Sequence, residues 1–108
     1  MIDDAIWQVE IEERAGRLVL RLRGELDIDT APKLLAAVQE VLTPGRAVVV
    51  DLAELTFVDS SGLGVLVTVW RRAQQVGAQL AVANPTADVA MTLQITGLDQ
   101  VLPRVELD

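Results

Sequence analysis

Two adjacent serines, Ser60 and Ser61, follow Asp59 where an apolar, strand-like run gives way to a helical pattern. The first turn of a helix offers unpaired backbone N–H groups and the positive end of the helix dipole. An anion is stable at such a position, so a phosphate added to a serine hydroxyl would be held there. Aspartate and serine are also common helix N-caps. The residues therefore allow two interpretations, a phosphorylation site or a simple cap.

Two glycines, Gly62 and Gly64, lie in the first turn of the same predicted helix. Glycine costs about 1 kcal/mol relative to alanine inside a helix. Capping does not explain either residue. We therefore expect another backbone to approach closely at these positions.

An acidic loop precedes the first predicted helix and contains Glu25, Asp27 and Asp29. The alternating carboxylates resemble part of a calcium loop, but the required glycine and the distal glutamate are missing. One interpretation is a solvated loop whose charge favours the following helix N-terminus. The other is a contact loop for a binding partner.

The chain contains no cysteine and no histidine, which excludes disulfides, the usual zinc sites and nucleophiles activated by histidine. Lys33 is the only lysine, and it lies in a predicted helix, so a serine hydrolase at Ser60 lacks a base. A receiver domain with a phosphorylated Asp51 lacks its acidic pair and late lysine, and we predict a structural role for Asp51. We expect no enzymatic activity, no catalytic residue, no cofactor and no metal.

The charge balance limits the possible partners. Nine basic and 16 acidic residues give a net charge of −7, which argues against direct nucleic-acid binding. The N-terminus lacks the basic and apolar regions of a signal peptide, and no apolar segment approaches the roughly 18 residues of a membrane span. We expect a cytoplasmic protein with no membrane contact.

The length of 108 residues fits one domain, residues 1–108. Apolar periodicity predicts two strands, a helix, a strand, a helix, a strand, a helix and a weak last strand. Helical crossovers require parallel neighbours, so we expect an α/β fold with a mixed sheet of four to five strands and three to four helices. The predicted elements are a hairpin at 7–11 and 18–22, a helix from Asp29 or Thr30 to Leu42, a strand at 47–52, a helix from Ser60 to Gly77, a strand at 80–83, a helix ending at Gly97 and a strand at 101–105 interrupted by Pro103.

The second predicted helix carries an apolar stripe that we expect to face the core. The stripe comprises Leu63, Leu66, Val67, Trp70 and Ala73. The third predicted helix has apolar residues at Val89, Leu93 and Ile95.

Four short sequence words occur in a specific order: GELD at 24–27, FVDSSGLG at 57–64, NP at 84–85 and TGL at 96–98. Together they resemble the STAS domain, specifically the bacterial anti-sigma-factor antagonists, over nearly the whole chain. The DSSGLG word is the most specific part. Relatives often carry a basic pair where this chain has Ala90 and Met91, and a hydrophobic residue at the position of Thr92, which leaves the identity of the partner open.

The resemblance implies that Ser60 is phosphorylated by an anti-sigma factor with serine-kinase activity that uses ATP. The unphosphorylated form would bind this anti-sigma factor and release a sigma factor, and a serine phosphatase would reset the switch. A non-switching STAS adaptor or scaffold, in a signalling complex or a lipid-transport system, is the alternative, and it has no need for an acceptor hydroxyl. The predicted partner-binding residues are Glu25, Asp27, Asp59, Ser60, Ser61, Gly62, Leu63 and Gly64.

Overall fold

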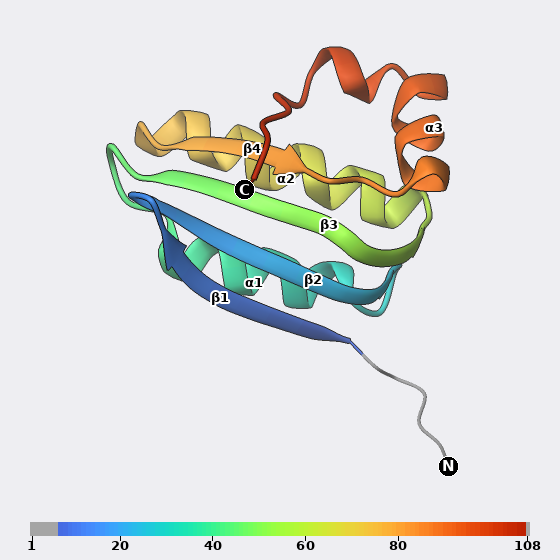
Figure 1. Ribbon diagram of the computed structural model, residues 1–108, viewed down its shortest axis with the longest axis horizontal. Coiled ribbons are helices and arrows are strands. Elements are labelled where there is room, and N and C mark those ends of the chain that lie inside the picture. Colours follow the sequence, from blue (N-terminus) through green and yellow to red (C-terminus); the bar gives the residue numbers. More distant parts are fainter. Residues whose placement is uncertain (1–6, 108) are drawn as a thin grey trace.

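The computed structural model describes residues 7–107. Two strands come first, and helices and strands then alternate in the predicted order, which confirms the α/β fold (Figure 1). A short 3₁₀ helix follows the last α-helix. The elements are β1 (Gln8–Arg14), β2 (Arg17–Leu26), α1 (Ala31–Val41), β3 (Ala47–Val58), α2 (Ser60–Val76), β4 (Gln79–Ala83), α3 (Ala87–Ile95) and the 3₁₀ helix η1 (Leu98–Gln100).

The sheet is mixed, with the strand order β1-β2-β3-β4. The hairpin pair β1 and β2 is antiparallel, whereas β2, β3 and β4 are parallel because α1 and α2 serve as crossovers. Figure 1 shows α1 and α2 side by side behind the sheet, and α3 at one end of the molecule. The C-terminal ends of β2, β3 and β4 meet at that same end.

The core lies between the sheet and the two crossover helices. It is built mainly from leucine and valine, and many of these side chains are completely inaccessible to solvent. A second, smaller cluster on the opposite face of the sheet contains Val19, Val49 and Ala83, over which Val105 and Leu107 pack. β3 is therefore covered on both faces, as its continuous apolar run predicted.

The predicted end of the central strand was wrong. The apolar run suggested a strand over 47–52, but β3 continues to Val58 and stays paired with β2 up to Leu26. Two register shifts between β2 and β3 change the side-chain alternation. The buried residues beyond the run are therefore Leu55 and Val58, three positions apart, and a test for strict alternation misses them.

The predicted last strand over 101–105 was also wrong. Within residues 7–107, this segment makes only one isolated parallel bridge, between Val82 and Arg104. Val82 donates its N–H to the carbonyl of Pro103, and Val105 donates its N–H to the carbonyl of Val82. Pro103 has no N–H to offer, so a continuous ladder cannot form.

The inward face of α2 agrees with most of the predicted stripe and adds further residues to it. The buried residues are Gly62, Val65, Leu66, Val69 and Ala73. Leu66 and Ala73 thus agree with the prediction, and so do Leu63 and Trp70, which are partly buried and pack against the core. Val67 is partly buried. Because the helix is apolar around most of its circumference from Leu63 to Trp70, periodicity alone does not select the inward direction.

Candidate functional site at the start of α2

Ser60 is the first residue of α2, and it is exposed. The cap of this helix is Asp59, whose carboxylate accepts a hydrogen bond of 2.9 Å from the N–H of Gly62. Ser61 is partly buried. Asp59 is therefore the cap of α2, and the Ser60 side chain is accessible at the donor-rich end of the helix.

A backbone hydrogen bond joins the start of α2 to the acidic loop. The N–H of Asp59 donates to the carbonyl of Leu26 at 3.2 Å, and Leu26 is also paired in register with Val58. Glu25 and Asp27 flank Leu26 in the sequence. The structure therefore brings together the two groups of residues that were predicted to bind a partner.

The acidic loop is held by hydrogen bonds that involve Thr30. Its hydroxyl accepts from the N–H of Asp27 and donates to the carbonyl of Glu25, both at 2.8 Å. The Asp27 carboxylate accepts from the N–H groups of Asp29 and Thr30 at 3.0 and 3.1 Å. Thr30 is the N-cap of α1 by position, but its side chain does not cap the helix. Sequence reasoning missed this role, although an Asp and a Thr three residues apart are typical of such turns.

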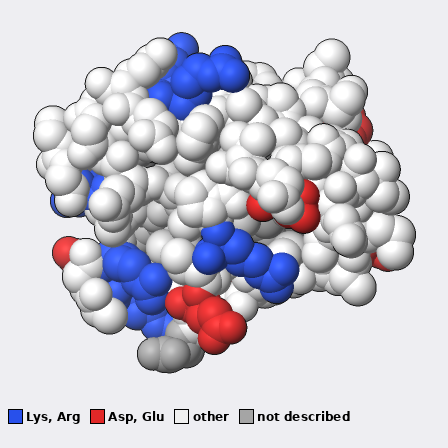
Figure 2. Space-filling view, turned by 90° about the horizontal axis from the view of Figure 1, so that it is seen from above, with Lys and Arg blue, Asp and Glu red and all other residues white. Residues whose placement is uncertain are grey.

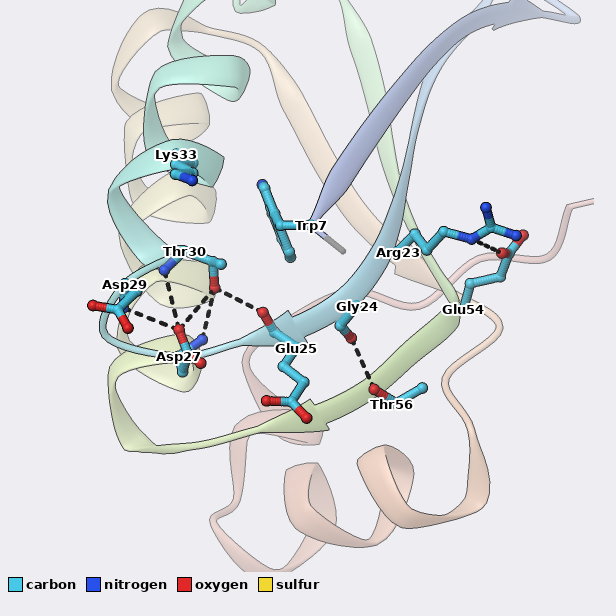
Figure 3. A pocket seen from close by; sticks show the side chains of 10 residues that line it. All are labelled: Trp7, Arg23, Gly24, Glu25, Asp27, Asp29, Thr30, Lys33, Glu54 and Thr56. Atoms are coloured by element: carbon cyan, nitrogen blue, oxygen red, sulfur yellow. Dashed lines mark hydrogen bonds and ion pairs between the residues drawn. The ribbon is translucent and has the colours of Figure 1, made fainter. Parts of the chain in front are cut away.

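A groove of about 980 Å³ opens beside this loop (Figure 3). It contains more carboxylates than cations, and one cation, Arg23, is paired with Glu54 at 2.8 Å. None of the residues 59–64 lines it, so only the acidic part of the predicted surface faces the groove. The lining residues are Trp7, Arg23, Gly24, Glu25, Asp27, Asp29, Thr30, Lys33, Glu54 and Thr56.

The two glycines of α2 have different surroundings. A Cβ atom on Gly62 would lie 2.5 Å from the carbonyl oxygen of Leu26 and 2.7 Å from a methyl carbon of Val58. The expected close backbone approach is thus confirmed at Gly62. The approaching backbone belongs to this chain, however, and Gly62 is buried, which corrects its assignment as a partner contact. A Cβ on Gly64 would meet nothing within 4 Å, and Gly64 is exposed.

Asp51 has the structural role that was predicted for it. Its buried carboxylate accepts hydrogen bonds from Arg21 at 3.2 Å, from the N–H of Ala53 at 3.0 Å and from the amide of Asn84 at 3.3 Å. The bond to Asp51 is the main reason that the pKa of Arg21 is raised. Asp51 therefore links β2, β3 and the turn after β4.

Two further properties of residues 7–107 bear on function. No cluster of three or more acidic side chains has the arrangement of a metal site among them. None of the helices in this part of the chain combines the length and the apolar character that crossing a bilayer requires.

The family model of the STAS domain matches residues 8–108, and the chain belongs to this family. The chain is 34% identical over 98 residues to the anti-sigma F factor antagonist of Paenibacillus polymyxa, a match that covers 89% of this chain and 84% of that protein. The crystal structure of an anti-sigma factor antagonist from Mycobacterium paratuberculosis aligns with a TM-score of 0.79 and 28% identity, covering 91% of this chain and 84% of the other.

A third relative is known in two phosphorylation states. The Bacillus cell fate determinant SpoIIAA in its phosphorylated form aligns with a TM-score of 0.67 at 23% identity, over 94% of this chain and 91% of the other. SpoIIAA in its unphosphorylated form aligns with a TM-score of 0.71 at 24% identity, over 94% and 89%. At these identities the similarity establishes the shared fold.

Proposed function

We propose that this protein is an anti-sigma factor antagonist whose binding is switched by phosphorylation of Ser60. The unphosphorylated form binds an anti-sigma factor that is also a serine kinase, and a sigma factor is thereby released in the cytoplasm. A serine phosphatase returns the phosphorylated form to the binding state. The observation that carries the proposal is the exposed Ser60 at the first turn of α2, next to a separate capping residue, Asp59.

The position of Ser60 supports a phosphorylated form that keeps the fold. A phosphate carries about −1.5 to −2 charges at neutral pH, and a helix N-terminus stabilises negative charge. Because Asp59 already caps Gly62, the helix does not depend on the Ser60 hydroxyl. The shared fold of SpoIIAA in its two forms is consistent with this behaviour in a relative.

The same phosphate opposes binding to the kinase. A kinase places the phosphates of its nucleotide and a carboxylate base next to the acceptor hydroxyl. After transfer, the phosphate on Ser60 therefore faces groups of like charge. Two like charges about 4 Å apart repel by about 4 kcal/mol at an effective dielectric constant of 20. This energy corresponds to roughly a thousandfold in affinity.

The proposal is tested with each purified anti-sigma factor kinase that the host genome encodes. One of them should add a single phosphate in the presence of ATP, as measured by intact-protein mass spectrometry. Ser60→Ala should abolish the modification, and the matched variant Ser61→Ala should keep it. A phosphate that persists in Ser60→Ala, at Ser61 or elsewhere, contradicts the assignment.

Binding measurements then separate a switch from an adaptor. Ser60→Ala should bind the anti-sigma factor constitutively, whereas the phosphoprotein should bind roughly a thousandfold more weakly, with an unchanged circular dichroism spectrum. Equal affinity of the two forms would instead support a non-switching STAS adaptor.

A further inference from the structure

The chain runs from the end of β4 through α3 and η1 and then returns to β4 (Figure 1). Two backbone hydrogen bonds with Val82, of 2.8 and 3.0 Å, hold the returning segment at the edge of the sheet. A cavity of about 170 Å³ lies between these segments, here called the α3 cavity. It shares no lining residue with the groove beside the acidic loop.

The lining of the α3 cavity changes from apolar to polar. The apolar lining residues are buried or partly buried. They are Val82, Pro85, Ala90, Leu93 and Leu102. The polar lining residues, Gln94, Asp99 and Arg104, are all exposed and therefore form the rim. Apolar walls with a few polar groups that converge on them are typical of sites for small molecules.

Helix α3 supplies one wall of the cavity with its inner side. Val89 and Leu93 are buried, whereas Ile95, which sequence periodicity grouped with them, is 77% exposed and faces outward. Ala90 and Leu93 are three positions apart and so lie on the same side of the helix. Because the side chain of Ala90 is small, it leaves space in the cavity that a larger residue would fill.

Two charges of opposite sign lie at the rim. Asp99 belongs to η1, and Arg104 belongs to the returning segment. Neither side chain forms a hydrogen bond or an ion pair with another residue of 7–107. Figure 2 views the molecule from above, the side on which α3 and η1 lie, and shows basic and acidic side chains near one another on a largely uncharged face. A ligand that carries both charges would satisfy both groups.

We infer that the α3 cavity binds a small aliphatic amino acid. The guanidinium group of Arg104 binds the carboxylate, because its planar fork can donate two parallel hydrogen bonds to the two oxygens. The carboxylate of Asp99 pairs with the ammonium group, which is a donor only. The aliphatic side chain lies on the apolar walls. The inference goes beyond the proposed function and does not depend on Ser60.

The size of the cavity supports this class of ligand. An apolar cavity of about 150 Å³ is large enough for benzene. The α3 cavity therefore accommodates the branched side chain of valine or leucine, with the charged groups of the amino acid at the rim. A nucleotide or a peptide is too large. A ligand with a carboxylate but no ammonium group would place a negative charge near Asp99 and leave that residue unpaired.

The test titrates leucine and valine into the isotope-labelled protein and follows the backbone amide chemical shifts. Saturable shifts should occur in α3, in η1 and in residues 102–104, with a Kd on the order of 1 mM or tighter. Arg104→Gln and Asp99→Asn should each weaken binding by about tenfold or more. The control is Arg46→Gln, which removes an exposed charge just before β3, and its Kd should stay within about twofold of the wild type.

Two further measurements define the ligand and the place where it binds. Ala90→Leu should fill the cavity and abolish the shifts in a folded protein. Isocaproate, which is leucine without its ammonium group, should bind about tenfold more weakly than leucine.

Three outcomes would overturn the inference and leave the proposed function standing, because none of them involves Ser60. The absence of saturable shifts with both leucine and valine would show that the cavity is no amino-acid site. Shifts that persist in Ala90→Leu would place the binding elsewhere. Equal affinity for isocaproate and leucine would show that Asp99 does not pair with an ammonium group.

Discussion

The two glycines at the start of α2 lie on opposite sides of the helix and meet different constraints. Two residues correspond to about 200° of rotation around a helix. Gly62 faces inward, where the Leu26 carbonyl and the Val58 side chain leave no room for a Cβ atom. Gly64 faces outward, one turn after Ser60, where a Cβ would meet nothing within 4 Å. At Gly62, internal packing requires a glycine. At Gly64, we propose that the glycine gives access to a partner.

The inward side also determines how the site is assembled. The Leu26 carbonyl lies against Gly62 and accepts the N–H of Asp59. The position of Ser60 relative to the acidic loop therefore depends on a contact that only glycine permits. A change on the inner side should act through the fold, whereas a change on the outer side should act through binding.

Gly62→Val gives the largest expected effect on stability. The new side chain would clash with backbone as well as with Val58, so the free energy of unfolding should fall by about 3 kcal/mol or more. Urea denaturation measures the change. The matched variant Gly64→Val places the same residue in the same turn and should alter stability by less than about 1 kcal/mol. Equal destabilisation by both variants would remove the distinction between the two sides.

Asp51→Ala measures how much a buried polar contact on the far face of the sheet contributes to the free energy of unfolding. Its loss leaves Arg21, Ala53 and Asn84 without their common acceptor, and the free energy of unfolding should fall by about 2 kcal/mol. Glu54→Ala, which breaks an exposed pair with Arg23, should cost less than about 1 kcal/mol. Equal urea midpoints for the two variants would show that the buried contacts of Asp51 stabilise the protein no more than the exposed pair of Arg23 and Glu54 does.

Gly64→Leu tests the outer side directly. The protein should remain folded because the position is open, but affinity for the anti-sigma factor should fall more than tenfold, or about 1.4 kcal/mol. Isothermal titration calorimetry measures the affinity. The control is Gln75→Leu, which adds a leucine at an exposed position near the far end of the same helix. Wild-type affinity in a folded Gly64→Leu protein would show that no partner approaches this turn.

Of the four main substitutions, Asp59→Ala should have the smallest effect. It removes the cap on Gly62 and should lower stability by about 1 kcal/mol. For a domain of this size, that loss corresponds to a fall in Tm of about 4–8 °C, which calorimetry resolves. Asp59→Asn keeps an acceptor oxygen and should recover most of the loss. A full loss in the Asn variant would assign the effect to charge instead of capping.

Most of the elements could be predicted because their signals are local. Pro32 in the first turn of α1, Gly77 at the end of α2 and the apolar run of β3 depend on backbone geometry and on neighbours within a few residues. The length of β3 and the fate of the segment 101–105 could not be predicted. Both depend on register shifts and on an edge pairing with Val82, which involve residues far apart in the chain.

The sequence by itself determined that a serine follows an aspartate at the start of a helix, and that two glycines there need an explanation. Capping preferences and helix propensities act within one turn, so they can be recognised without coordinates. Only the tertiary structure decided that Gly62 faces Leu26 while Gly64 faces solvent, and that Ile95 has no cover within the described chain. The physical reason is that the direction of a helix face depends on what packs against it. That contact is made by strands and loops distant in sequence, to which periodicity along one helix is insensitive.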